Sequence, residues 1–171
     1  MLSAGMKPLE PPDSHHLSAA LGWMGLGNFT EARVEFERIV PAFRSHPAVL
    51  AAQFELEAKS GHWDVAAAVA DTLTRLEPDE PGAWISLAYA TRRKTGGGLA
   101  AARAILMRAG RTFPTEKIIA YNLACYDCQL GDLAGARVWL DQACRLGNAV
   151  KIRQMAREDP DLEPLWPELG Q

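Results

Sequence analysis

The chain has 171 residues and a mass of 18.7 kDa; 48% of its residues are apolar and 23% are charged, a composition that excludes an intrinsically disordered chain and a membrane protein. Its formal net charge of −3 provides no basic field for nucleic acid or for a membrane surface. Three cysteines, an odd number, cannot form a closed set of disulfides, so we expect free thiols and a cytoplasmic protein.

The N-terminal residues lack the continuous apolar stretch of a secretory signal peptide. Residues 7–13 are polar and rich in proline. We therefore expect residues 1–12 to form a mobile leader. No later stretch approaches the roughly 18 uninterrupted apolar residues that a transmembrane helix needs.

A pattern of glycine, large apolar residue and alanine recurs along most of the chain. The glycines are spaced by 34, 36 and 34 residues, at Gly27, Gly61, Gly97 and Gly131. Two residues after them stand Phe29, Trp63, Leu99 and Leu133, and five residues after them stand Ala32, Ala66, Ala102 and Ala136. Repetition at this period is typical of arrays in which each unit buries its apolar face against the next.

The pattern resembles the tetratricopeptide repeat (TPR) family, whose unit is a helix–turn–helix of 34 residues. Trp84, Leu87 and Ala88 are similar to the start of a family unit. The resemblance covers about residues 13–148 and implies an all-α fold, a right-handed α-solenoid with a C-terminal capping helix. Its four units would span about 13–46, 47–80, 81–116 and 117–148.

Local signals place the helices within these units. We expect first helices at about 15–26, 47–60, 81–94 and 115–130, and second helices at about 30–45, 64–76, 99–111 and 133–146. Gly27, Gly61 and Gly131 should end helices with a positive φ, and Asn28 and Asp132 should cap the helices that follow. Pro41 lies inside the second predicted helix of the first unit, so we expect a kink or an early end there.

Residues 149–171 are predicted to form the capping helix and a tail. The pattern over 149–158 is amphipathic, with Val150, Ile152 and Met155 as expected buried positions. The following Asp-Pro-Asp-Leu-Glu-Pro-Leu resembles the tail of some bacterial TPR arrays. Because the last unit of an array exposes an apolar face, we expect Leu162, Leu165 and Trp166 to cover it.

The family resemblance also implies a binding groove for a protein or peptide partner, lined by the first helices. Transferred to this sequence, the groove positions are Leu17, Leu21, Met24, Glu55, Ile85, Tyr89, Arg92, Ile118, Tyr121, Asn122 and Cys125. We expect Tyr89 and Tyr121 to be the main anchors, as tyrosine often is at interfaces. The family's carboxylate clamp is not implied, because Leu17 and Leu21 stand where it needs lysine and asparagine.

The sequence contains no spacing typical of a catalytic site or of a bound cofactor. Its first functional hypothesis is a non-enzymatic protein-interaction module or scaffold. The first alternative is a thiol or zinc protein that uses Cys125, Cys128 and Cys144, since the first two share one helix face. The second is a secretion-type TPR chaperone, a class of small acidic proteins. The partner and the oligomeric state are not indicated by the sequence.

Overall fold

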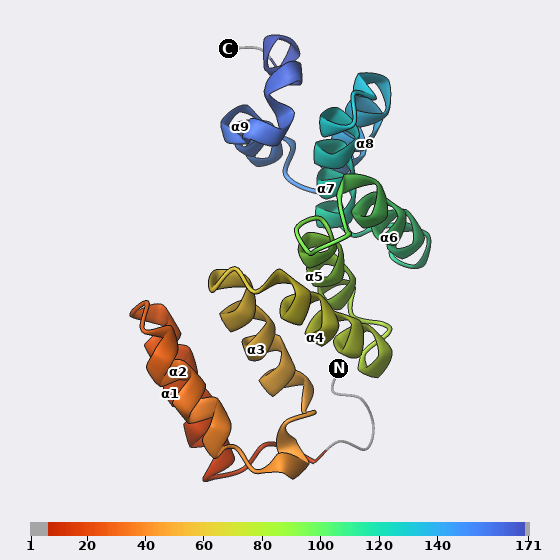
Figure 1. Cartoon of the computed structure of the whole chain (residues 1–171). Coiled ribbons are helices and arrows are strands. Elements are labelled where there is room, and N and C mark those ends of the chain that lie inside the picture. The colour runs from red at the N-terminus through yellow and green to blue at the C-terminus, as the bar shows by residue number, and fades with distance from the viewer. Residues whose placement is uncertain (1–6, 170–171) are drawn as a thin grey trace. The chain divides into compact units, whose positions relative to one another are not determined.

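The computed structural model describes residues 7–169, and this part of the chain consists of helices and turns with no β-strand (Figure 1). The expected first helices correspond to α1 (Asp13–Gly25), α3 (Pro47–Lys59), α5 (Pro81–Thr91) and α7 (Lys117–Gln129). The second helices are α2 (Phe29–Arg38), α4 (Trp63–Leu76), α6 (Leu99–Thr112) and α8 (Leu133–Leu146). Helix α9 (Ala149–Glu158) and the 3₁₀ segment η2 (Pro160–Glu168) follow. Residues 1–6 of the expected leader and residues 170–171 of the tail lie outside the described residues.

The helix ends confirm most of the local predictions. Gly27, Gly61 and Gly131 have φ values of 74°, 75° and 86°, the left-handed conformation that glycine adopts without a Cβ clash. The side chains of Asn28 and Asp132 accept hydrogen bonds from the N–H groups of Glu31 and Gly135. Helix α2 ends at Arg38, and Pro41 begins a short 3₁₀ turn, η1 (Pro41–Phe43), so the expected early end occurs.

The chain divides between Ser86 and Leu87, within α5, into two compact units that each bury a core. In the N-terminal unit, one apolar cluster joins α1, α2 and α3 through Met24, Ala32 and Leu56. A second cluster joins α3, α4 and the start of α5, and consists of Leu50, Val69, Leu73 and Ala83 with Phe54 packed against it. These contacts fix the faces that the first helices α1 and α3 leave exposed.

The C-terminal unit is organised around α7, which packs against both α6 and α8. Leu123, Ala124 and Tyr126 on α7 are almost fully buried. Helix α9 packs on α8, and η2 returns to contact α7. Leu162 and Leu165 are buried, as expected, whereas Trp166 is 36% exposed.

Helix α9 corrects one expectation about burial. Ile152 is buried as predicted, but Val150 is 78% exposed and Met155 is 48% exposed. The helix packs on α8 and on η2, its buried residues are Ile152 and Ala156, and the other apolar side chains stay uncovered. Within residues 7–169, every helix is too short or too polar to cross a lipid bilayer.

Candidate functional site

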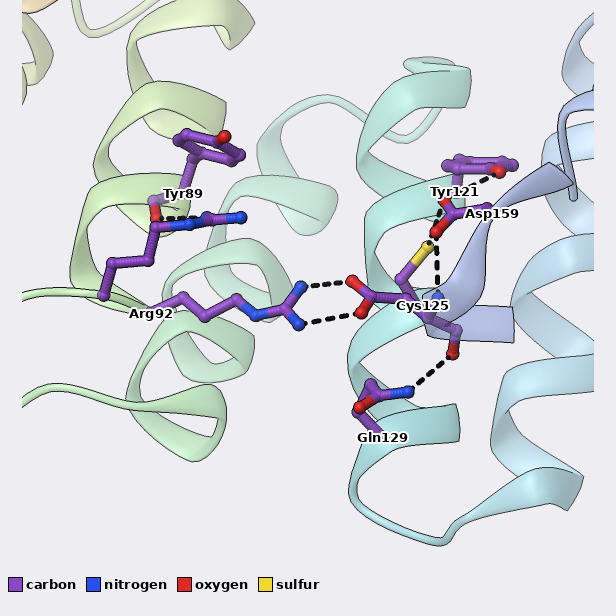
Figure 2. Close-up of polar contacts among 8 residues, drawn as sticks. Tyr89, Arg92, Tyr121, Cys125, Gln129 and Asp159 are labelled. Carbon is purple, nitrogen blue, oxygen red and sulfur yellow. Dashed lines mark hydrogen bonds and ion pairs between the residues drawn. The ribbon is translucent and has the colours of Figure 1, made fainter. Parts of the chain in front are cut away.

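The tail that follows α9 crosses helix α7 close to the end of α5 (Figure 2). Asp159 caps η2 by accepting a hydrogen bond from the backbone N–H of Asp161 at 3.0 Å. The same turn directs both carboxylates toward α5 and α7. We call the contacts made there the tail latch: Arg92, Tyr121, Cys125 and Gln129 on one side, Asp159 and Asp161 on the other.

A bidentate ion pair holds one end of the tail latch. The guanidinium of Arg92, just after α5, donates to both carboxylate oxygens of Asp161, with the Nη2–Oδ1 distance at 2.8 Å. This hydrogen bonding lowers the pKa of Asp161 below its ordinary value. Gln129 Nε2 donates to the backbone carbonyl of Asp161 at 3.0 Å. The tail is therefore held both by its charge and by its main chain.

Two neutral donors hold the other carboxylate. Tyr121 Oη donates to Asp159 Oδ2 at 3.1 Å, and Cys125 Sγ donates to the same oxygen at 3.6 Å. Burial is the largest cause raising the pKa of both groups, and the nearby Asp159 acts in the same direction. The phenol and the thiol therefore stay protonated at neutral pH and act as hydrogen-bond donors to the tail.

Buried ion pairs that were not predicted from the sequence also connect successive helix pairs. Arg33 on α2 donates to both oxygens of Glu57 on α3, and Arg103 on α6 donates to both oxygens of Asp127 on α7. Both carboxylates are at least 94% buried as side chains. In each case the arginine stands six residues after a repeat glycine and 24 residues before its acidic partner. This recurring spacing is the sequence feature from which the two ion pairs could have been predicted.

The last repeat has an arginine at the same position, Arg137, which pairs with Glu168 in η2. The tail therefore supplies the acidic partner that a further unit would have supplied. The successive helix pairs and the ion pairs that join them describe a helical repeat array.

Solved structures with the same fold come from other proteins of low sequence identity. TTC0263, a thermophilic TPR protein of Thermus thermophilus, matches with a TM-score of 0.70 and 22% identity over 92% of this chain and 83% of its own. MamA from Desulfovibrio magneticus RS-1, from residue 41 to its end, matches with a TM-score of 0.69 and 14% identity over 80% and 76%. A double mutant described as MamA RS-1 ArsTM gives 0.68 and 14% over 81% and 76%.

This chain has a TPR-like helical repeat fold. At 14–22% identity the solved structures establish the fold alone. No protein-family model matches the sequence. No curated protein matches it significantly either.

In the C-terminal unit, the predicted groove residues fall into two groups. Arg92, Tyr121 and Cys125 lie together at the tail latch, where the chain's own residues occupy them. Tyr89 is 41% exposed, with the Arg93 guanidinium 3.7 Å from its ring centroid. Ile118 is also exposed, and its carbonyl accepts a hydrogen bond from Asn122 at 2.9 Å. The family resemblance implied these groove positions but could not show that the tail occupies three of them.

In the N-terminal unit, the predicted groove residues are more dispersed. Glu55 is exposed and lines a pocket of about 330 Å³ with an apolar floor that includes Phe54 and Leu73. Leu21 is exposed, whereas Met24 belongs to the core. The remaining two, Leu17 and Ile85, are half-buried.

The chemistry of the latch does not favour a metal centre. Among the described residues, one group of three potential ligands has donor atoms within 4.8 Å of one another: Cys125, Asp159 and Asp161. Each of these carboxylate oxygens already accepts a hydrogen bond from a group within the latch. Cys128 and Cys144 are not part of the group, so the geometry does not support a shared zinc site for the three cysteines.

Proposed function

We propose that this TPR chain is a non-enzymatic protein-interaction module that binds partner segments on the faces of its first helices. The observation that supports this most strongly is the tail latch. There, α7 and the end of α5 hold the acidic start of the 3₁₀ segment η2 through a guanidinium, a phenol, a thiol and a side-chain amide. These are the interactions by which a partner segment in the same conformation would be recognised.

The tail itself has the features of a bound peptide. Asp161 provides charge and a main-chain acceptor, and the next residue, Leu162, is fully buried. One apolar anchor beside directional polar contacts is the usual composition of a peptide-binding site.

The ionisable groups of the latch support a binding role over a catalytic one. The Cys125 thiol has a raised pKa, whereas a catalytic cysteine needs a lowered one. Asp161 is neutralised by Arg92 and so is a poor general base. We place the module in the cytoplasm, where its three free cysteines would stay reduced.

Site-specific photocrosslinking tests the proposed function. A photoreactive amino acid is placed in the full chain at Leu21, Glu55 or Tyr89, which are exposed predicted groove positions. Matched controls carry it at Val65 and Val138, which are exposed on second helices. We expect discrete crosslinked proteins from the groove positions and none of them from the controls. The same products from both sets, or none from either, would contradict the proposal.

A further inference from the structure

A recessed surface of the C-terminal unit lies between α7 and α9. We call it the α7–α9 pocket. Its walls are apolar and come from Ile118 and Tyr121 on α7 and from Ile152 and Met155 on α9. Ile118 and Met155 are exposed, so the apolar surface is open to an incoming group. Met155, one of the exposed apolar side chains of α9, therefore forms part of the wall of this pocket.

The size of the pocket limits what it can accept. Its volume is about 150 Å³. Sites for small molecules and cofactors are typically about 300–1,000 Å³. The α7–α9 pocket therefore has room for one large apolar side chain and is too small for a cofactor or for an extended acyl chain.

Two lysines make the rim of the pocket positive. Lys117 and Lys151 line it, and no carboxylate does. Across residues 7–169, neither ammonium group forms an ion pair; the carboxylate of the adjacent Glu116 instead caps α7 by accepting from the N–H of Ile118. Both lysines stand in the first turn of a helix, where the helix dipole adds to the positive potential.

Gly147 keeps this arrangement in place through a close approach. A Cβ at this position would lie 2.9 Å from Cδ of Lys117 and 2.8 Å from Cδ1 of Ile152. The glycine thus allows the lysine stem and one apolar wall to lie against the end of α8. The Lys117 side chain therefore lies close to the apolar wall formed by Ile152.

We propose that the α7–α9 pocket binds a partner segment in which one large apolar residue is flanked by aspartate or glutamate. The apolar residue fills the pocket, and the flanking carboxylates pair with Lys117 and Lys151. This inference rests on the proposed function and specifies the partner chemistry at one of its surfaces. Charge complementarity with an unpaired positive rim is what selects an acidic segment.

Selection from a random-peptide phage library on the immobilised full chain tests the pocket. The wild type should enrich peptides with a large apolar residue between acidic residues. The variant Lys117→Gln/Lys151→Gln should bind a synthetic enriched peptide at least about fivefold more weakly, from the loss of two exposed charge pairs. Lys59→Gln, an exposed lysine on α3, is the matched control and should not change the affinity.

A second pair of variants tests the apolar part without relying on the lysines. Met155→Glu places a carboxylate in the wall of the pocket and should reduce binding of the same peptide by about tenfold or more, because it adds repulsion to lost apolar contact. Val150→Glu, on the same helix but outside the pocket lining, should bind normally. Because both positions are exposed, both variants should keep the wild-type circular dichroism and melting temperature.

The outcomes distinguish failure of the pocket proposal from failure of the proposed function. Acidic peptides that bind equally to all variants would overturn the pocket assignment and leave the interaction module standing. An absence of enriched peptides would overturn the pocket, and with an absence of photocrosslinks it would overturn both proposals. Sedimentation with phosphatidylglycerol vesicles that Met155→Glu abolishes, without any enriched peptide, would assign the pocket to lipid and also overturn the inference.

Discussion

At the scale of single residues, the buried carboxylates of α3 and α7 each depend on one arginine from the preceding helix. Glu57 accepts from Arg33 and also lies 2.8 Å from His62 Nδ1. Asp127 is 1% exposed and depends on Arg103. A buried charge that loses its partner keeps the full cost of its desolvation, whereas a partly exposed arginine can turn to water. The two partners of one pair should therefore differ in the effect of their removal.

Replacing Arg103 tests this asymmetry. Arg103→Met keeps the aliphatic stem but leaves Asp127 buried and unpaired, so we expect a loss of about 3 kcal/mol in the free energy of unfolding. Asp127→Asn, which keeps a polar acceptor for Arg103, should cost about 1–2 kcal/mol. Urea denaturation followed by circular dichroism measures both.

The matched control is Arg38→Met, because the Arg38 side chain is 55% exposed and its partner Glu35 keeps a second contact, at 2.7 Å from His16 Nδ1, when Arg38 is removed. We expect a loss under about 0.5 kcal/mol there. Equal losses for Arg103→Met and Arg38→Met would mean that the buried pair adds no stability beyond an exposed one.

At the scale of elements, the tail after α9 is held by residues far from it in the sequence, on α7 and at the end of α5. Because Cys125 lies beneath Asp159 and its thiol has a raised pKa, its reactivity reports opening of the latch. Cys144 is half-buried and is not part of the latch, so it serves as an internal reference.

Removing Arg92 should expose Cys125. In the wild type, iodoacetamide should label Cys144 first and Cys125 far more slowly. Arg92→Met removes both hydrogen bonds to Asp161, and we expect at least about tenfold faster labelling of Cys125, measured by peptide mass spectrometry. Arg111→Met, an exposed position at the end of α6, is the control. Unchanged labelling of Cys125 in Arg92→Met would show that the ion pair does not hold the tail closed.

The elements also show which features could be predicted from the sequence. Helix ends depend on neighbouring residues such as Gly61, Asp132 and Pro41, so the pattern located them within a few residues. The Arg92–Asp161 pair joins residues 69 positions apart, and no local signal matches them. Helical periodicity showed that α9 is amphipathic but could not show which flank of the helix meets α8, and this is why the burial expected for Val150 and Met155 was wrong.

At the scale of the whole molecule, each unit of the chain buries its own core on either side of the Ser86–Leu87 boundary. In repeat arrays, stability is approximately a sum of unit stabilities and of contacts between neighbours. Loss of structure caused by one substitution should therefore extend over fewer helices than in a globular domain with one shared core.

A charged residue at Ala66 tests whether the N-terminal unit can lose structure while the C-terminal unit stays folded. Ala66 is completely buried on α4, so Ala66→Arg forces a large charge into packed surroundings and should destabilise the protein by about 3–5 kcal/mol. The adjacent Val65 is exposed, and Val65→Arg should have little effect. Hydrogen exchange followed by mass spectrometry should show that Ala66→Arg removes amide protection from α3 and α4 while α7 and α8 stay protected. Equal loss of protection in all four helices would mean that the two units unfold as one cooperative body.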